Sequence, residues 1–189
     1  MAYLPAFLDL QGKKVLLIGG GKVALRKLKY LLDFQAKITL VATEISSEVQ
    51  ELLHFHNITH HIRPYSKDDI LSQHIIVVCI DDIELQKTIY NAAQAQGSLC
   101  NCVDLLECSD FIFPSYIKKD RLLITISTSS ISPAFAKGLR LYLEKCLPEG
   151  MVTFLDELAQ LRKSMPKGQK RMDLLTKKVQ SFFEERMRG

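Results

Sequence analysis

Three consecutive glycines in the run VLLIGGGKVALRK could hold the phosphates of a nucleotide. Gly19, Gly21 and Ala24 follow the spacing Gly-x-Gly-x-x-Ala, directly after an apolar run and directly before a helical pattern. The first glycine allows a tight turn, the second lets the main chain approach a pyrophosphate, and the small third residue lets helix and strand pack closely. The first turn of the helix adds N–H donors and positive potential. Because the strand and helix context is present, we expect a dinucleotide site here rather than a plain turn.

An acidic residue at the end of the second strand would complete such a site by binding a ribose hydroxyl. That strand ends here in VATE, so Thr43 stands at the strand tip and Glu44 lies one step beyond it. Neither position carries a Lys or Arg that could receive a 2′-phosphate. The pattern therefore favours NAD over NADP.

Three aspartates follow apolar runs, at the place where ligands collect in open α/β sheets. Asp104 ends the run LCNCVD, and Asp81 and Asp82 follow IIVVCI. Asp82 precedes a helical pattern, and we interpret it as the N-cap of that helix. For Asp104 the residues alone leave two interpretations open, a catalytic carboxylate or a turn residue.

The cysteines and histidines do not have the spacing of a familiar metal site. Cys100, Cys102 and Cys108 are close in sequence, but their spacing is neither that of a zinc ribbon nor that of a ferredoxin. We interpret them as small buried hydrophobic side chains and expect no metal. Four histidines straddle a helix end and an edge strand, which indicates a polar surface. These are His54, His56, His60 and His61.

Short β-branched runs alternate with helical patterns through the first hundred residues. Several runs are apolar at consecutive positions, as in strands that are covered on both faces. The alternation predicts a parallel sheet with right-handed crossovers, that is, an α/β fold with a Rossmann-like sheet. The predicted strands are Val15–Ile18, Ile38–Ala42, Ile58–Ile62, Ile75–Ile80 and Leu99–Val103, and the predicted helices cover about 22–34, 46–55 and 82–96.

The pattern changes after Pro114. A strand is predicted at Leu122–Ser127, followed by a polar run. Ser132 and Pro133 then form a favourable N-cap and first helical position. We expect this helix to end near Cys146.

Two further helices are predicted at about 151–163 and 169–187. Apolar side chains of the last helix form one stripe, which we interpret as a packing or dimer surface. They are Met172, Leu175, Val179, Phe182 and Phe183. From Met151 onward nine Lys and Arg stand against five Asp and Glu, so the net charge of +4 belongs to this part of the chain.

Composition excludes several classes of protein. The chain has 189 residues, of which 47% are hydrophobic and 24% charged, as in a folded globular protein rather than a disordered one. Its apolar runs are far shorter than the ~20 residues that span a bilayer. The first residues lack the basic start of a secretion signal, and five cysteines do not pair evenly. We therefore expect a cytoplasmic protein without membrane or nucleic-acid partners.

Taken together, these motifs resemble the precorrin-2 dehydrogenase family, the NAD-dependent module of siroheme biosynthesis. The likeness extends over essentially the whole chain, beginning with LPAFLDLQGKKVLLIGGGKVALRK and TLVATE. It is most specific at NCVDLLECSDFIFPSYIKKDRLLITISTSSISPAFAKGLR. Members occur alone, as bifunctional dehydrogenase–chelatases, or as the N-terminal part of siroheme synthase.

The resemblance implies three parts and a homodimer. An NAD-binding Rossmann-like domain would cover residues 1–113, a dimerisation region 114–150, and a small helical C-terminal domain 151–189. Two departures stand out. Ser129-Ser130 replaces a glycine common in the family, and Cys79-Ile80 stands where Ala-Thr is usual.

The resemblance also implies a reaction, the oxidation of precorrin-2 to sirohydrochlorin by NAD. It puts Lys22, Val23, Thr43 and Glu44 at the dinucleotide and makes Asp104 the catalytic aspartate. A carboxylate beside the nicotinamide can accept a proton or orient the substrate while a hydride leaves. A substrate with eight carboxylates also suits a basic C-terminal region.

Two alternative functions stay open at this point. A bifunctional enzyme would also insert ferrous iron into sirohydrochlorin, with Asp104 accepting pyrrole protons. A non-catalytic dinucleotide sensor would need only the glycine turn. Such sensors tend to carry the acidic residue at the end of the second strand, and they have no reason for the FIFP and SISP segments.

Overall fold

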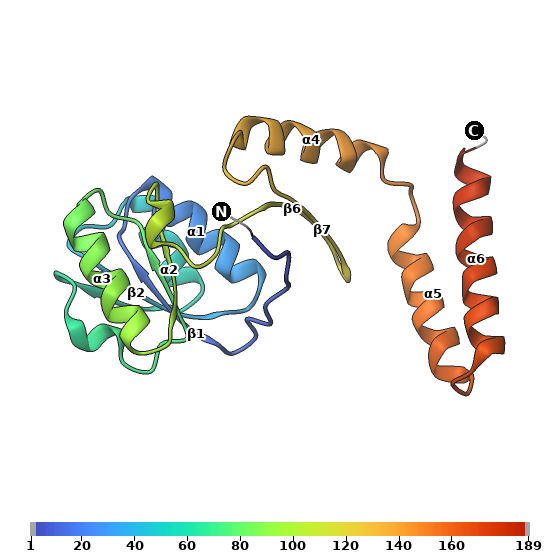
Figure 1. The fold of residues 1–189 in the computed structure, drawn as a ribbon, viewed down its shortest axis with the longest axis horizontal. Coiled ribbons are helices and arrows are strands. Elements are labelled where there is room, and N and C mark those ends of the chain that lie inside the picture. The colour runs from blue at the N-terminus through green and yellow to red at the C-terminus, as the bar shows by residue number, and fades with distance from the viewer. Residues whose placement is uncertain (1–2, 188–189) are drawn as a thin grey trace. The chain divides into compact units, whose positions relative to one another are not determined.

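The computed structural model describes residues 3–187, and its parts are shown in Figure 1. Within this range the chain divides into two compact units, one ending at Ile112 and the other beginning at Phe113. The extreme ends of the predicted first and last domains, residues 1–2 and 188–189, lie outside the described residues. The division into three parts at 113 and 150 stays a prediction.

The first unit is built on one parallel sheet, as the alternating pattern predicted. Its described strands follow the order β3-β2-β1-β4-β5. The chain therefore adds strands outward from β1 on one side and then returns to add β4 and β5 on the other. The strands are β1 (Lys14–Ile18), β2 (Lys37–Ala42), β3 (Thr59–Ile62), β4 (Ile75–Val78) and β5 (Leu99–Cys102).

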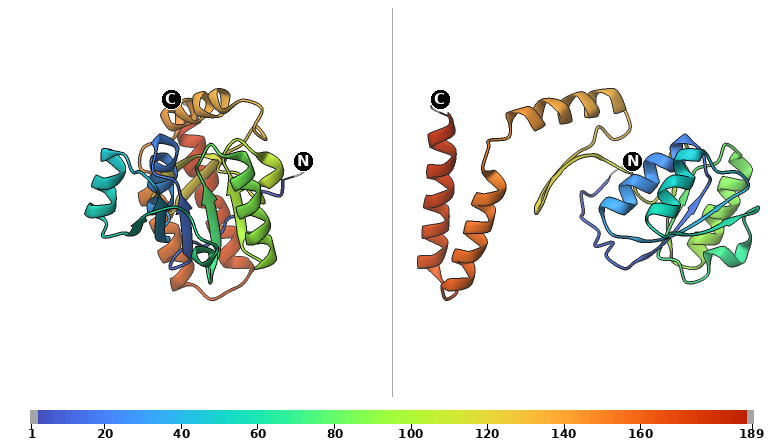
Figure 2. Two further views of the ribbon diagram at one scale, coloured as in Figure 1. Left: turned by 90° about the vertical axis from the view of Figure 1, so that its left-hand side faces the viewer. Right: turned by 180° about the vertical axis from the view of Figure 1, so that it is seen from behind.

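Helices cover both faces of this sheet. α1 (Lys22–Asp33) and α2 (Ser47–Phe55) lie on one face and α3 (Ile83–Ala95) lies on the other (Figures 1 and 2). Short 3₁₀ turns, η1 (Lys67–Ile70) and η2 (Leu106–Cys108), precede β4 and follow β5. This arrangement confirms the predicted α/β class and places the bounds of each of these strands within two residues of the predicted ones.

The central strands are unbroken apolar runs because they are buried under helices on both faces of the sheet. All four residues of β4 are buried, as are the last four of β1. Leu16, Leu40 and Val77 have no exposed surface. The edge strand β3 differs, since all four of its residues are exposed. His60 and His61 therefore lie on the surface, as interpreted from the sequence.

The second unit begins with an antiparallel hairpin. Its strands are β6 (Ser115–Lys119) and β7 (Leu122–Ile126), and only β7 was predicted. The turn between them is Asp120-Arg121, with Asp120 at φ 50°. Two-residue hairpin turns usually contain Asn-Gly or Asp-Gly. The turn here contains no glycine, so nothing in the sequence signals the hairpin.

The helix α4 (Pro133–Cys146) packs against the hairpin and begins as predicted. The Ser132 hydroxyl accepts a hydrogen bond from the main-chain N–H of Phe135 at 3.2 Å, and Pro133 occupies the first turn. Ser129 and Ser130, which precede it, have φ values of 50° and 67°. These serines take the left-handed conformation that glycine adopts without strain.

The last two helices, α5 (Met151–Ser164) and α6 (Gln169–Met187), form an antiparallel pair (Figure 1). The rings of Phe154 and Phe182 stack at 4.1 Å, and the Arg186 guanidinium lies 3.7 Å from the Phe182 ring centre. Part of the predicted apolar stripe thus serves packing, whereas Met172 stays 56% exposed. No helix described between residues 3 and 187 combines the length and apolar character needed to cross a membrane.

Candidate functional site

The first two glycines of the turn fit where another residue would not. Gly19 has φ 116°, and its N–H donates to Val41 O at 2.9 Å. A Cβ on Gly19 would overlap the carbonyl oxygen of Cys79, and one on Gly20 would overlap that of Glu44. The end of β1 is therefore pressed between the chain that leaves β4 and the chain that leaves β2. Gly20 was not among the predicted site residues, because the motif leaves that position unspecified.

Gly21 has a different role, since a Cβ there would meet nothing within 4 Å. It is the N-cap of α1, with φ −89° and ψ −166°, and no side chain caps this helix. Lys22 and Val23 follow in the first turn, which holds no acidic residue. Open space, free first-turn N–H groups and the positive end of the helix together suit an anion such as a pyrophosphate.

The other predicted nucleotide residues lie at the same edge of the sheet. Thr43 and Glu44 directly follow β2 and are exposed. The main chain of this segment is tied to the glycine turn, because Ser46 N–H donates to Gly20 O at 2.9 Å. The structure thus brings the glycine turn and Thr43-Glu44 together, as a ribose site beside a phosphate site requires.

Asp104 lies at this edge too, beyond the end of β5. Since β4 separates β5 from β1, and neighbouring strands are about 4.8 Å apart, Asp104 is about 10 Å or more from the glycine turn along the edge. Its side chain is exposed, and its main chain has φ 61°. Non-glycine residues in this left-handed region are uncommon and cluster at functional sites.

A side-chain clamp fixes the loop that carries Asp104. The Ser109 hydroxyl accepts from Cys102 N–H at 3.0 Å and lies 3.1 Å from the carbonyl oxygens of Cys102 and Leu105. It therefore ties the loop on both sides of Asp104. Ser109 is also paired with Asn101 by a short antiparallel bridge.

Asp110 anchors the far end of the same loop. Its Oδ2 atom accepts from Cys100 N–H at 2.8 Å and from Gln94 Nε2 at 2.7 Å. Asn101, which is 6% exposed, donates from Nδ2 to Phe111 O at 2.8 Å. The asparagine and the SDF residues of the most specific motif thus serve to hold the Asp104 loop against β5. Sequence reasoning missed Ser109 and Asp110, since their partners lie on β5 and α3.

A half-buried lysine, Lys27, stands near Asp104. Burial in α1 lowers the pKa of Lys27 from 10.5 to about 8; the charge of Arg26 lowers it further and that of Asp104 opposes the shift. Burial likewise raises the pKa of the Cys79 thiol to about 12, so Cys79 is no nucleophile at neutral pH. Lys27 was not predicted, because its place in the helical pattern looks solvated.

The remaining candidates have structural roles. The Asp82 carboxylate accepts from Leu85 N–H at 3.0 Å, which confirms the predicted N-cap of α3. Cys100 and Cys102 are buried with their sulfur atoms 3.9 Å apart, and Cys108 lies in the same core cluster. Within residues 3–187, no three His, Cys, Asp or Glu side chains gather as a metal site would require.

The sequence of this chain is similar to those of known proteins. Residues 6–115 match the family described as "Putative NAD(P)-binding". The siroheme synthase of Nitrosococcus oceani is 34% identical over 149 residues, which is 79% of this chain and 32% of that protein. The siroheme synthase of Pseudoalteromonas atlantica is 32% identical over 189 residues, covering 100% of this chain and 40% of that protein. The chain thus spans about a third of the length of these relatives.

A solved structure is similar over both units. It is titled "SirC, precorrin-2 dehydrogenase" and has a TM-score of 0.78 and 27% sequence identity. The likeness covers 93% of this chain and 88% of that one. It therefore includes the sheet with its glycine turn as well as the hairpin and helices that follow.

Proposed function

We propose that this chain, a member of the NAD(P)-binding family, oxidises precorrin-2 to sirohydrochlorin with NAD as the hydride acceptor. The observation that carries the proposal is the likeness to a precorrin-2 dehydrogenase over 93% of the chain. A shared nucleotide fold alone would leave the substrate open, because this fold serves many reactions. The likeness also extends beyond Phe113, outside the nucleotide fold, and this is what favours precorrin-2 as the substrate.

The nucleotide would lie along the edge of the sheet from β2 to β5. Gly19, Gly21, Lys22 and Val23 would hold the pyrophosphate, since a Cβ at Gly21 would meet nothing and the first turn of α1 offers unpaired donors. Thr43 and Glu44 would bind the adenosine ribose. Neither is a cation, which favours NAD over its 2′-phosphorylated form.

Asp104 would act at the nicotinamide end. Oxidation removes two hydrogens from the substrate, one as a hydride and one as a proton. The nicotinamide supplies the hydride acceptor, and the exposed Asp104 carboxylate can accept the proton or orient the carbon that gives it up. The clamp by Ser109 and Asp110 would keep the main chain that carries this carboxylate in place.

The second unit would provide a dimer surface and a basic lobe. Large apolar side chains stay exposed on and before α4, among them Ile131 at 86% and Phe135 at 62%. A contiguous exposed apolar patch is typical of protein interfaces. The excess of Lys and Arg beyond Met151 would attract the carboxylates of the tetrapyrrole.

A cytoplasmic location completes the proposal. All five cysteines are free, as is usual where thiols are kept reduced.

The test supplies purified protein with enzymatically made precorrin-2 and NAD. Sirohydrochlorin and NADH should appear together in equal amounts. Binding of NAD without product would contradict the dehydrogenase assignment and favour a sensor. Ferrous ion added to isolated sirohydrochlorin, compared with the spontaneous rate, tests metal insertion separately.

A further inference from the structure

Arg63 lies just past β3, beside the end of β2. Its main-chain N–H donates to Ala42 O at 2.9 Å, which continues the pairing of the two strands one residue beyond Ile62. Ala42 immediately precedes Thr43 and Glu44. Arg63 therefore stands next to the segment that would bind the adenosine ribose.

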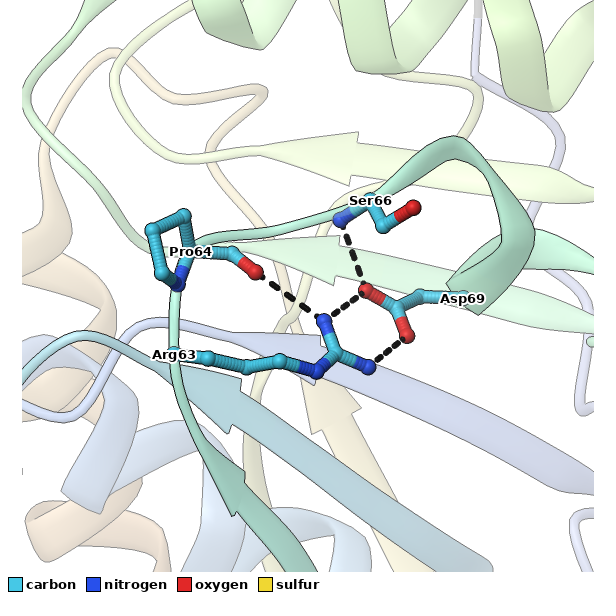
Figure 3. A network of polar contacts seen from close by, with 4 residues as sticks. All are labelled: Arg63, Pro64, Ser66 and Asp69. Carbon is cyan, nitrogen blue, oxygen red and sulfur yellow. Dashed lines mark hydrogen bonds and ion pairs between the residues drawn. The ribbon is translucent and has the colours of Figure 1, made fainter.

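The Arg63 guanidinium is not free to turn toward this edge of the sheet, because it forms a bidentate ion pair with the Asp69 carboxylate (Figure 3). Nη1 donates to Asp69 Oδ2 at 2.9 Å and Nη2 to Oδ1 at 2.5 Å. Nη1 also donates to Pro64 O at 3.0 Å. Bidentate pairs of this kind fix the orientation of the guanidinium plane.

Asp69 is itself held in place. Its Oδ2 accepts from Ser66 N–H at 2.8 Å, as part of the capping box that begins η1. The next residue, Ile70, is fully buried in the core. The Asp69 side chain is 10% exposed, whereas that of Arg63 is 42% exposed. Asp69 is therefore a fixed anchor, and Arg63 is the partner able to move.

We propose that Asp69 is a specificity-determining residue that disfavours NADP by withholding Arg63 from the 2′-phosphate. The inference rests on the proposed nucleotide function. A 2′-phosphate beside Thr43-Glu44 needs an uncompensated cation, and Arg63, whose main chain pairs with Ala42, would supply it once released from Asp69. While Arg63 is paired with Asp69, the pair carries no net charge. If Arg63 moved to the phosphate, the Asp69 carboxylate would stay buried without its partner.

The principal test is Asp69→Asn, with binding of NAD and NADP measured by calorimetry. Asparagine keeps an oxygen for Ser66 N–H but removes the charge that holds Arg63. The ratio of the NADP to the NAD dissociation constant should fall about tenfold, the size expected of one added charge pair in partly screened surroundings. Asp68→Asn is the matched control, since it removes the same charge from the same turn and should leave the ratio within about twofold of the parent.

Two further variants keep the inference falsifiable. In Arg63→Gln the Asp69 charge loses its compensation, so NADP binding should weaken about threefold or more relative to NAD. In the double variant Asp69→Asn/Arg63→Gln the gain seen with Asp69→Asn should disappear. An unchanged ratio in Asp69→Asn with NAD binding intact overturns the proposal, as does an unchanged ratio in Arg63→Gln should Asp69→Asn fail to fold. A parent protein that binds neither nucleotide would instead refute the proposed function.

Discussion

The glycine turn (Gly19–Gly21) and the aspartate loop (Val103–Asp110) meet the same edge of one sheet but are shaped by different means. Main-chain atoms pack against main-chain atoms in the glycine turn, and the missing side chains of Gly19 and Gly20 make this possible. In the aspartate loop, Ser109 and Asp110 form hydrogen bonds that hold a strained Asp104. The shape of the glycine turn thus follows from one short motif, whereas that of the aspartate loop depends on partners elsewhere in the fold.

The variant Gly20→Ala tests whether the glycine turn depends on its close main-chain contacts. A Cβ there would overlap Glu44 O and lie 2.8 Å from Ile45 Cα, so the chain after β2 must move. Urea unfolding should show a loss of about 3 kcal/mol in the free energy of unfolding, the upper range for overpacking a close-packed site. A loss below about 1 kcal/mol would mean that the turn does not depend on this contact.

Gly21→Ala separates binding from folding within the same turn. The new methyl group meets no protein atom within 4 Å, and alanine at an N-cap costs about 1 kcal/mol of stability at most. The methyl would occupy the path of the pyrophosphate, so NAD affinity should fall about 100-fold. Calorimetric titration checks this, and unchanged affinity would move the pyrophosphate away from Gly21.

Ser109→Ala tests the clamp of the aspartate loop. Loss of the hydroxyl leaves Cys102 N–H without its partner and frees the Asp104 loop, so kcat should fall about tenfold while NAD affinity stays within about twofold. Ser98→Ala is the matched control. Ser98 is buried whereas Ser109 is half-buried, so its hydroxyl is the harder of the two to remove; it bonds Gln73 O at 2.7 Å and precedes the opposite end of β5. It should lose stability without this loss of rate; equal rate losses in both variants would show a general effect of stability.

The smallest predicted effect concerns Lys27. This residue lies on α1, the helix that follows the glycine turn, and it interacts with the charge of Asp104 in the aspartate loop. Its pKa is lowered to about 8 in the folded protein, so the folded state releases a proton before the unfolded state does. Stability should therefore rise between about pH 8 and pH 10.5 as the buried charge is lost. Relative to Lys27→Met, the parent should gain about 1 kcal/mol between pH 7.5 and pH 9.5 in urea unfolding. A parallel pH profile for both proteins would contradict the burial of a charged Lys27.

The contrast between the two regions also explains what could be predicted from sequence. Strands, helices and the caps at Asp82 and Ser132 depend on local patterns, and the structure agrees with them. The strand β6 was missed because its turn at Asp120 carries no glycine. Ser109 and Asp110 were missed for a physical reason of another kind, since their partners are main-chain groups and side chains of β5 and α3. No local pattern reports such contacts.

The most direct test of the account measures NAD affinity and sirohydrochlorin formation on one preparation of the parent and of Asp104→Ala. Asp104 is exposed and lies beyond β5, two strands from β1 and the glycine turn, so the variant should fold and bind NAD within about twofold of the parent. Its rate of precorrin-2 oxidation should fall about 1,000-fold, within the range for loss of a general base. Oxidation at the parent rate would contradict the catalytic role of Asp104.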